Sequence, residues 1–171
     1  MIVKDNQKNG DGLSILGFGC MRFPSKAGVV DENRTIKMIR SAIDAGVNYF
    51  DTAYFYHGGK SESILGEALS GGYRERVMIA TKLPPFMLSS LGGAKKIFAI
   101  QTRKLKTDYI DYYLLHMLTD KATYDRMVNL GVVEWLEDLK SQGRIKNIGF
   151  SFCICQLKTI PYFNRKLGQL K

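Results

Sequence analysis

Four polar residues stand directly after short apolar segments of the sequence: Asp51, Lys82, His116 and Ser151. Short runs rich in apolar and aromatic residues are typical of strands that are buried on both faces of a parallel sheet. The residue after such a strand lies at its carboxyl end, and in a (β/α) barrel that edge is the catalytic face. The sequence therefore predicts that these four side chains lie on one rim of the molecule.

The types of these residues indicate a proton-donating site. A tyrosine hydroxyl has an ordinary pKa of about 10, so it is a weak acid at neutral pH unless a nearby cation stabilises its phenolate form. Tyr56 is the candidate acid, Lys82 is the candidate cation, and Asp51 is the carboxylate that keeps the lysine protonated. A neutral His116 would donate a hydrogen bond to a carbonyl oxygen. This constellation fits the protonation of a carbonyl oxygen while hydride reaches its carbon.

Each of these residues also has an ordinary structural interpretation. Asp51 is able to cap the following turn, Lys82 to be a solvated loop lysine, and His116 to be a hydrogen-bonded core histidine. A second catalytic alternative is a lyase in which Lys82 forms a Schiff base with a carbonyl substrate. The other histidine, His57, lies in a glycine-rich segment and is expected to be an exposed loop residue. Two histidines are too few for the usual metal clusters, which disfavours a metal-dependent hydrolase.

The elements that would position these residues alternate between strands and helices. Apolar runs predict five strands, at 13–18, 47–50, 77–81, 109–115 and 145–150. Apolar residues at three- and four-residue spacing predict helices from a cap at Asp31 to Ala45, from a cap at Ser61 to Leu69, at 95–106 and at 132–141. The segment 119–129 has no clear pattern and is expected to be an irregular connection. This order of elements predicts an α/β fold with a parallel sheet.

Length and composition place the chain among globular proteins. It has 171 residues, of which 45% are hydrophobic, and no apolar segment reaches the roughly 18 residues that a membrane-spanning helix needs. Its first residues lack the apolar core of a secretory signal, so we expect a cytoplasmic protein with no membrane partner. The net charge is +9, but four of these charges lie in 152–171, so no concentrated basic face indicates nucleic acid as a partner. Three cysteines, Cys20, Cys153 and Cys155, cannot all pair as disulfides and cannot supply the four thiolates of an iron–sulfur cluster.

Five ordered motifs resemble the aldo-keto reductase family over about residues 12–152. They are Gly17–Arg22, Asn48–Ala53 with Tyr56 and Glu62, Ala80–Lys82, Asp108–His116, and Gly143–Ser151. Members of this family are (β/α)8 barrels that use a nicotinamide cofactor and a tetrad of Asp, Tyr, Lys and His. The resemblance implies that Asp51, Tyr56, Lys82 and His116 are this tetrad and that the substrate is a small-molecule carbonyl compound.

The resemblance also implies that the cofactor is NADP(H). The residues that would contact it are Gly19, Cys20, Met21, Arg22, Asp51 and Ser151. The segments 56–62 and 149–152 are most similar to a bacterial and archaeal branch whose members carry a ferredoxin-like iron–sulfur module after the barrel. In other branches an asparagine after the serine helps to hold the nicotinamide carboxamide, but this chain has Phe152 there, which leaves Ser151 as the remaining contact.

The family barrel has eight βα units, and this chain is expected to contain about five. We therefore expect an incomplete (β/α)8 TIM barrel over residues 1–152, followed by a non-family basic tail over 153–171. Leu157, Ile160, Phe163 and Leu167 predict that this tail folds as a short helix. We interpret the chain as the product of a truncated or frame-shifted coding sequence.

An incomplete barrel has consequences for function. In the family the cofactor phosphates are held largely by loops after strands seven and eight, so NADPH is expected to bind this chain weakly. Unpaired strands at both edges of the sheet predict self-association. Three functions stay open: an NADPH-dependent reductase of aldehydes or ketones, a Schiff-base lyase using Lys82, and a non-catalytic barrel fragment.

Overall fold

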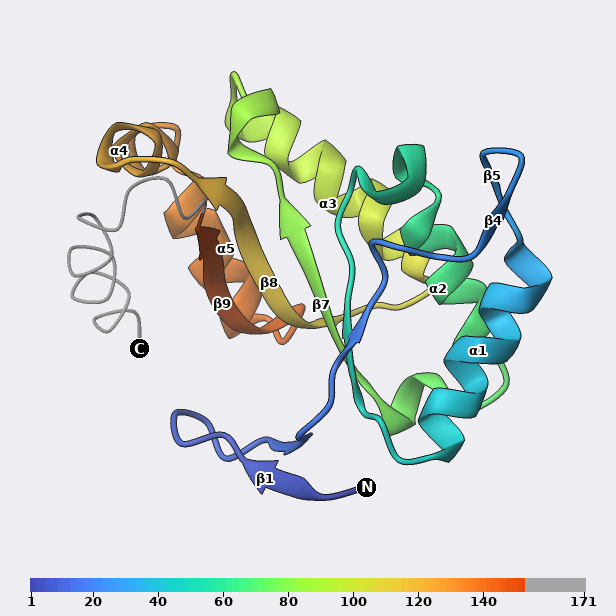
Figure 1. Ribbon diagram of the computed structural model, residues 1–171. Coiled ribbons are helices and arrows are strands. Elements are labelled where there is room, and N and C mark those ends of the chain that lie inside the picture. The colour runs from blue at the N-terminus through green and yellow to red at the C-terminus, as the bar shows by residue number, and fades with distance from the viewer. Residues whose placement is uncertain (153–171) are drawn as a thin grey trace.

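Five parallel strands form a curved sheet in a computed structural model that describes residues 1–152 (Figure 1). The predicted tail at 153–171 lies outside the described residues. The strands are β3 (Phe18–Gly19), β6 (Tyr49–Asp51), β7 (Met78–Leu83), β8 (Ile110–Leu118) and β9 (Ile145–Phe152), and they pair in this order. The strands of this sheet therefore lie side by side in the order in which they follow one another along the chain, as in a (β/α) barrel. The predicted α/β class and incomplete barrel are confirmed.

Helices connect successive strands and pack on the outer side of the sheet (Figure 1). They are α1 (Glu32–Asp44), α2 (Ser61–Ala68), α3 (Leu91–Leu105), α4 (Lys121–Asn129) and α5 (Val132–Ser141). Short 3-10 helices lie at η1 (Tyr56–Gly59), η2 (Arg74–Arg76) and η3 (Pro85–Met87). Asp31 caps α1 by accepting a 3.0 Å hydrogen bond from the backbone N–H of Arg34, as predicted. None of the described helices combines the length and apolar character that a membrane span requires.

The first predicted strand, 13–18, is wrong as a single element. The chain instead forms a hairpin of β1 (Val3–Asp5) and β2 (Gly12–Ser14), leaves it at Ile15 and Leu16, and re-enters the structure as β3. Ile15 and Leu16 are each 58% exposed, so their apolar character does not reflect burial in a strand. A run of apolar residues cannot by itself reveal this break.

The beginnings of three helices also differ from the predictions. The segment 119–129 is not an irregular connection: it contains α4, capped by Asp120, whose carboxylate accepts a 2.7 Å hydrogen bond from the N–H of Thr123. α3 begins at Leu91 with Ser90 as its cap, four residues before the predicted start at Lys95. Ser61 is the first residue of α2 and not its cap, because its hydroxyl is buried against other groups of the protein.

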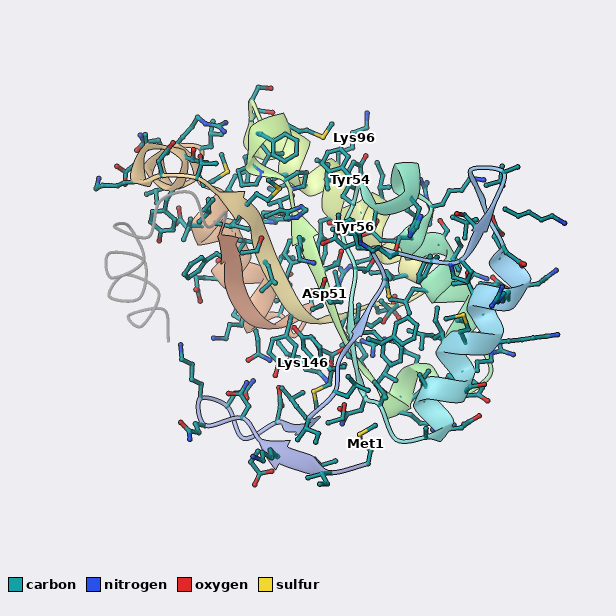
Figure 2. All side chains as sticks on the ribbon, viewed as in Figure 1. Met1, Asp51, Tyr54, Tyr56, Lys96 and Lys146 are labelled. Carbon is teal, nitrogen blue, oxygen red and sulfur yellow. The ribbon has the colours of Figure 1, made fainter. Side chains whose placement is uncertain are left out.

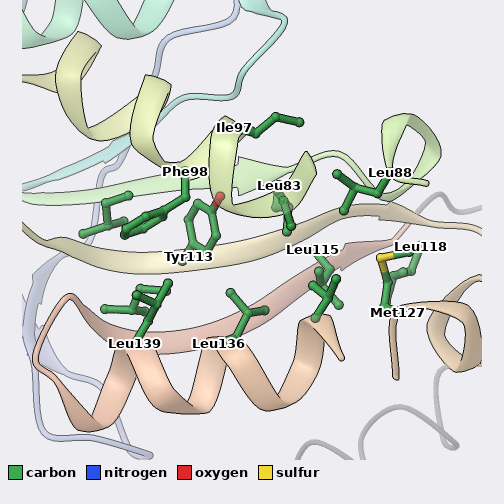
Figure 3. Close-up of a cluster of buried hydrophobic side chains, with 14 of the residues drawn as sticks. Leu83, Leu88, Ile97, Phe98, Tyr113, Leu115, Leu118, Met127, Leu136 and Leu139 are labelled. Atoms are coloured by element: carbon green, nitrogen blue, oxygen red, sulfur yellow. The ribbon is translucent and has the colours of Figure 1, made fainter. Parts of the chain in front are cut away.

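A hydrophobic core lies between β7, β8 and β9 and the helices α3 and α5 (Figure 3). Tyr113, Leu115 and Leu118 of β8 are almost completely buried in it. The Tyr113 ring contacts Phe98 of α3, with centroids 5.3 Å apart, and Leu118 lies beside Met127 of α4 (Figure 3). A second core under α1 and α2 contains Phe50 and Ile79. These two cores hold the strands rigidly, which fixes the side chains at their carboxyl ends.

The amino ends of the strands are held by a buried ion pair. Asp111 is 1% exposed and accepts hydrogen bonds from Arg74 at 2.8 Å, from Lys146 at 2.8 Å and from the N–H of Ile79 at 3.0 Å. The N-terminal hairpin lies at this end of the sheet (Figure 1), where Asn9 donates hydrogen bonds to Tyr112 and Asn147. A further short hairpin, β4 (Ser25–Lys26) with β5 (Val29–Val30), precedes α1. The amino edge is therefore closed by structural contacts, and the carboxyl edge is the one left for chemistry.

Candidate active site

The predicted catalytic residues meet at the carboxyl edge of the sheet. Asp51 is the last residue of β6, Lys82 is the penultimate residue of β7, and His116 lies near the end of β8. The parallel register aligns these strands, with Asp51 beside Ala80 and Lys82 beside Leu114. β7, β8 and β9 extend beyond their predicted ends, so Lys82, His116 and Ser151 lie within strands and not just after them. Figure 2 shows Asp51 close to Tyr56, with Lys146 toward the opposite end of the sheet.

Lys82 occupies the centre of the site. Its side chain is only 5% exposed, and its ammonium donates hydrogen bonds to a carboxylate oxygen of Asp51 at 2.6 Å, to the carbonyl oxygen of Thr52 at 2.7 Å and to the hydroxyl of Tyr56 at 3.4 Å. An ammonium group has three N–H donors and no acceptor, so these three partners use its full hydrogen-bonding capacity. Lys82 is thus buried with all of its donors engaged, and the alternative interpretation of it as a solvated loop lysine is wrong.

Tyr56 begins the 3-10 helix η1, which follows β6 after a short turn. Its backbone N–H bonds to the carbonyl of Ala53 at 3.1 Å, and this turn brings the ring back over the strand ends. The Lys82 ammonium lies 5.0 Å from the ring centre. Because the Tyr56 oxygen accepts a hydrogen bond from this ammonium, its own O–H remains a donor for a bound ligand.

His116 completes the group of four predicted residues. Its ring meets the Tyr56 ring edge to face, with centroids 6.1 Å apart, and the residue is 8% exposed. Burial and the nearby Lys82 cation lower the pKa of His116, while Asp51 opposes this shift. The imidazole is therefore neutral at pH 7 and has one N–H donor. Its Nδ1 atom is buried, and no group among residues 1–152 forms a hydrogen bond with it. Within these residues, therefore, no partner of Nδ1 determines which ring nitrogen of His116 carries the proton.

A buried polar network supports the strand that carries Lys82. Glu62 of α2 is fully buried, and one of its carboxylate oxygens accepts hydrogen bonds from Thr81 and Gln101, each at 2.7 Å. Gln101 in turn donates to the carbonyl of Lys82 at 3.1 Å and accepts from the hydroxyl of Tyr113 at 2.6 Å. Burial raises the pKa of Glu62, although Thr81, Gln101 and nearby lysines act in the other direction. The network joins α2, α3, β7 and β8 directly behind the site.

A cleft of about 570 Å³ opens above Tyr56 and His116. Most of its other lining side chains are apolar and exposed: Met21, Phe55, Phe86 and Met117. The rings of Phe55 and Phe86 stack with centroids 5.3 Å apart. A large apolar surface exposed beside buried polar groups is typical of a ligand-binding pocket.

The residues predicted to contact a cofactor flank this cleft. Gly19 ends β3, and no other group lies within 4 Å of the position that a Cβ atom would take there, so space is open at the strand end. Met21 is 57% exposed, whereas Cys20 is fully buried and its backbone bonds to Asp51 and to Ser61. The Cys20 thiol is thus part of the core, and burial raises its pKa.

Ser151 lies on the opposite side of the rim from Gly19. Its hydroxyl oxygen accepts a 2.8 Å hydrogen bond from the N–H of Met117, so its own O–H is available to a ligand. Gly19 thus leaves open space at one edge of the sheet, Ser151 offers a hydroxyl donor at the other, and the Asp51 side chain between them is 35% exposed. Their contact with a nicotinamide stays a prediction. Arg22 follows Met21 and is exposed, and its contact with the cofactor stays a prediction.

Some residues of the site were not found by sequence reasoning. The carbonyl of Thr52 binds Lys82, and Phe55 and Phe86 shape the cleft. His57 is not an exposed loop residue: it is half-buried and accepts a hydrogen bond from the N–H of Phe23 at 3.0 Å. Phe55 and Phe86 could have been found only from their position, because both are aromatic residues in loops that follow strands. A backbone carbonyl such as that of Thr52 leaves no signal in a sequence.

Comparison with known proteins gives a consistent match. The family model described as the aldo/keto reductase family matches residues 15–166. This match extends past residue 152 into the segment assigned to a tail, and the domain boundary at 152 stays a prediction.

Two curated relatives illustrate the similarity. The uncharacterized oxidoreductase YqkF of Bacillus subtilis is 31% identical over 148 residues, which are 81% of this chain and 45% of YqkF. The methylglyoxal reductase YeaE of Escherichia coli is 36% identical over 118 residues, which are 68% of this chain and 38% of YeaE. The chain spans less than half the length of each of these relatives.

Solved structures show the same fold. The holo form of the aldo-keto reductase AKR11C1 from Bacillus halodurans matches with a TM-score of 0.78 and 28% identity, covering 96% of this chain and 54% of that protein. An aldo/keto reductase from Klebsiella pneumoniae, in complex with NADP and acetate, matches with a TM-score of 0.70 and 27% identity. The match covers 85% of this chain and 48% of the Klebsiella chain.

Proposed function

Because the chain belongs to the aldo/keto reductase family, we propose that it carries the proton-donating half of an NADPH-dependent site that reduces an aldehyde or ketone to an alcohol. The observation that carries this proposal is the set of three hydrogen bonds from the buried Lys82 ammonium to Asp51, Thr52 and Tyr56. This arrangement holds a cation beside a tyrosine hydroxyl, which is what a tyrosine acid requires.

The chain's own residues have separable roles in this reaction. When bound, NADPH supplies a hydride to the carbonyl carbon. The O–H of Tyr56 gives its proton to the carbonyl oxygen, and the Lys82 ammonium stabilises the phenolate that remains until a solvent proton replaces the one lost. Neutral His116 donates a hydrogen bond to the same oxygen, which stabilises the negative charge that develops there. Asp51 keeps Lys82 charged and oriented.

The same geometry argues against the Schiff-base lyase. A lysine nucleophile must lose its proton, but a buried lysine next to a carboxylate is stabilised in the charged form, and all three N–H groups of Lys82 are already engaged. Borohydride trapping separates the two functions: a Lys82 adduct with an aldehyde would support the lyase, and its absence alongside NADPH oxidation supports the reductase.

The cleft indicates the kind of carbonyl compound that would bind. Apolar and aromatic side chains dominate its walls outside Tyr56, His57 and His116. We propose a substrate whose carbonyl group points to the polar floor and whose apolar body contacts Phe55 and Phe86. The motifs at 56–62 and 149–152 further favour placing the chain in the family branch whose members carry an iron–sulfur module. A cytoplasmic location stays a prediction.

The direct test is NADPH oxidation by this chain with a panel of aldehydes and ketones, compared with Tyr56→Phe. The substitution removes the acid but keeps the ring beside His116 and Lys82. We expect turnover to fall by about 10²- to 10⁴-fold, the usual contribution of general acid catalysis. NADPH affinity should be nearly unchanged because the hydroxyl acts mainly in the transition state. Unchanged turnover in Tyr56→Phe would show that another group donates the proton.

A further inference from the structure

His57 joins the two loops that flank the cleft. Its Nε2 atom accepts a 3.0 Å hydrogen bond from the backbone N–H of Phe23, which is distant in sequence. Its ring also stacks on the Phe23 ring with centroids 4.8 Å apart and an interplanar angle of 4°. Phe23 is 6% exposed and belongs to the core under α1 and α2, so it provides a rigid anchor.

The backbone at His57 is adapted to this contact. His57 has φ 55° and ψ 43°, which is the left-handed conformation that residues other than glycine seldom adopt. Gly58 follows with φ 62°, so the chain turns sharply immediately after Tyr56. Such a conformation persists only when surrounding contacts hold it, and the bond and stacking to Phe23 are contacts of this kind.

The two loops that His57 joins have different proposed roles. Residues 19–22 would contact the nicotinamide ring, and Tyr56 would donate the proton. Two other hydrogen bonds, from Cys20 N–H to the Asp51 carbonyl at 2.8 Å and from the Ser61 hydroxyl to the Cys20 carbonyl at 2.9 Å, hold the beginning of the first loop. The bond to His57 holds its end, at Phe23. The exposed residue Met21 lies between these fixed points and lines the cleft together with His57.

From this arrangement we propose that His57 is a positioning residue that couples the cofactor-contacting loop to the loop of Tyr56. The proposal rests on the proposed function, because it needs NADPH to contact residues 19–22. His57 acts through Phe23 and has no proton-transfer role itself. A ring nitrogen accepts a hydrogen bond only when it carries no proton, so the contact also fixes the His57 tautomer with its proton on Nδ1.

Two variants separate the hydrogen bond from the ring. His57→Phe keeps a flat ring to stack on Phe23 but removes the acceptor, and His57→Gln removes the ring but offers a carbonyl oxygen at similar reach. We expect the amide hydrogen of Phe23 to exchange about tenfold faster in His57→Phe, and NADPH to bind about tenfold more weakly, since a buried N–H is left unpaired. His57→Gln should restore both values to near those of the unaltered chain. In the unaltered chain, the nitrogen spectrum of His57 should show Nε2 without a proton.

Hydrogen exchange by NMR and calorimetry with NADPH on the whole 171-residue chain make these measurements. Exchange in β7 and β8 serves as the internal control for folding. If protection in these strands falls together with that of Phe23 in both variants, His57 serves only folding and the proposal is overturned. It is also overturned if His57→Phe accelerates exchange at Phe23 but leaves NADPH affinity unchanged, or if it alters neither. If the unaltered chain does not bind NADPH either, the proposed reductase function fails, and the proposed coupling fails with it. The exchange rates of the Phe23 amide would then still show that His57 holds the two loops together.

Discussion

Lys82 connects the groups that would perform the reaction. Removal of its charge should disable Tyr56 as an acid, because the phenolate would lose the cation that stabilises it. In Lys82→Met the charge is removed, but an unbranched side chain of similar size remains. We expect this variant to lower turnover by about 10²- to 10⁴-fold. Steady-state kinetics with saturating carbonyl substrate measures this effect.

The double variant Tyr56→Phe with Lys82→Met tests whether the two residues act as one unit. Residues that serve a single catalytic step have strongly non-additive effects, so the double variant should be no slower than the slower single variant. Additive losses would mean that Lys82 contributes independently of Tyr56, for example by orienting substrate.

At the scale of single residues, the sequence was most informative where chemistry coincides with strand ends. Asp51, Lys82 and His116 were found because each follows an apolar run, and Tyr56 was found because it lies five residues after Asp51. His57 was misjudged because its partner, the N–H of Phe23, is 34 residues away and backbone donors are not visible in a sequence. The acidic residue Glu62 matched a family motif, but its complete burial could not be read from its type.

At the scale of elements, Glu62 determines how α2 and α3 are joined to β7. Burial raises its pKa, so the folded state binds its proton more tightly than the unfolded state does. The resulting stabilisation is fully present below the unfolded pKa, about 4.3 for glutamate, and is lost as the pH rises through the higher folded pKa. Stability of the unaltered chain should thus contain a component that decreases from pH 4 toward neutrality.

The variant Glu62→Gln lacks this titration, so its stability relative to the unaltered chain should increase as the pH rises. Urea unfolding at several pH values measures the difference. Glu67→Gln on the same helix is the matched control: Glu67 is exposed, and its hydrogen bond with Lys106 lowers its pKa, which gives a small effect of opposite sign. Parallel pH profiles for Glu62→Gln and the unaltered chain would contradict a raised pKa at Glu62.

Element boundaries show where sequence patterns stop being informative. The helix at 132–141 was predicted to the residue from Val133, Leu136 and Leu139 as inward residues and Gly143 as its stop. The structure buries Leu136 and Leu139 as predicted, but it buries Val132 completely and Val133 only partly. α4 was missed because only Tyr124 and Met127 of its nine residues are buried, too few to produce a clear period. The break between β2 and β3 was missed because exposed Ile15 and Leu16 imitate a buried strand.

At the scale of the whole molecule, the sheet has two edges, at β3 and β9, within residues 1–152. β9 is eight residues long, and in that part of the chain only β8 pairs with it. A long unpaired strand edge favours pairing with another chain. We expect light scattering to show self-association of the 171-residue chain that increases with protein concentration. A monodisperse monomer throughout the concentration range would contradict this expectation.

Weak cofactor binding by the 171-residue chain on its own is a further expectation. The residues proposed to contact NADPH would lie at its nicotinamide end, whereas the resemblance places the loops that hold the phosphates after strands seven and eight of the family barrel. Hydrogen bonds to charged groups contribute about 1.5 to 3 kcal/mol each, so a few missing phosphate contacts weaken binding by orders of magnitude. Any assay of this chain should therefore use high concentrations of NADPH.

The most direct test of the proposed site is a single-turnover reaction at millimolar NADPH that carries deuterium at the transferable position, followed by mass spectrometry of the alcohol. The account predicts an alcohol with one deuterium on the former carbonyl carbon from the unaltered chain, and at least 10²-fold less of it in the same time from Tyr56→Phe. No labelled alcohol from a chain that binds NADPH, or equal yields from the two proteins, would contradict the assignment of Asp51, Tyr56, Lys82 and His116 as a carbonyl-reducing site.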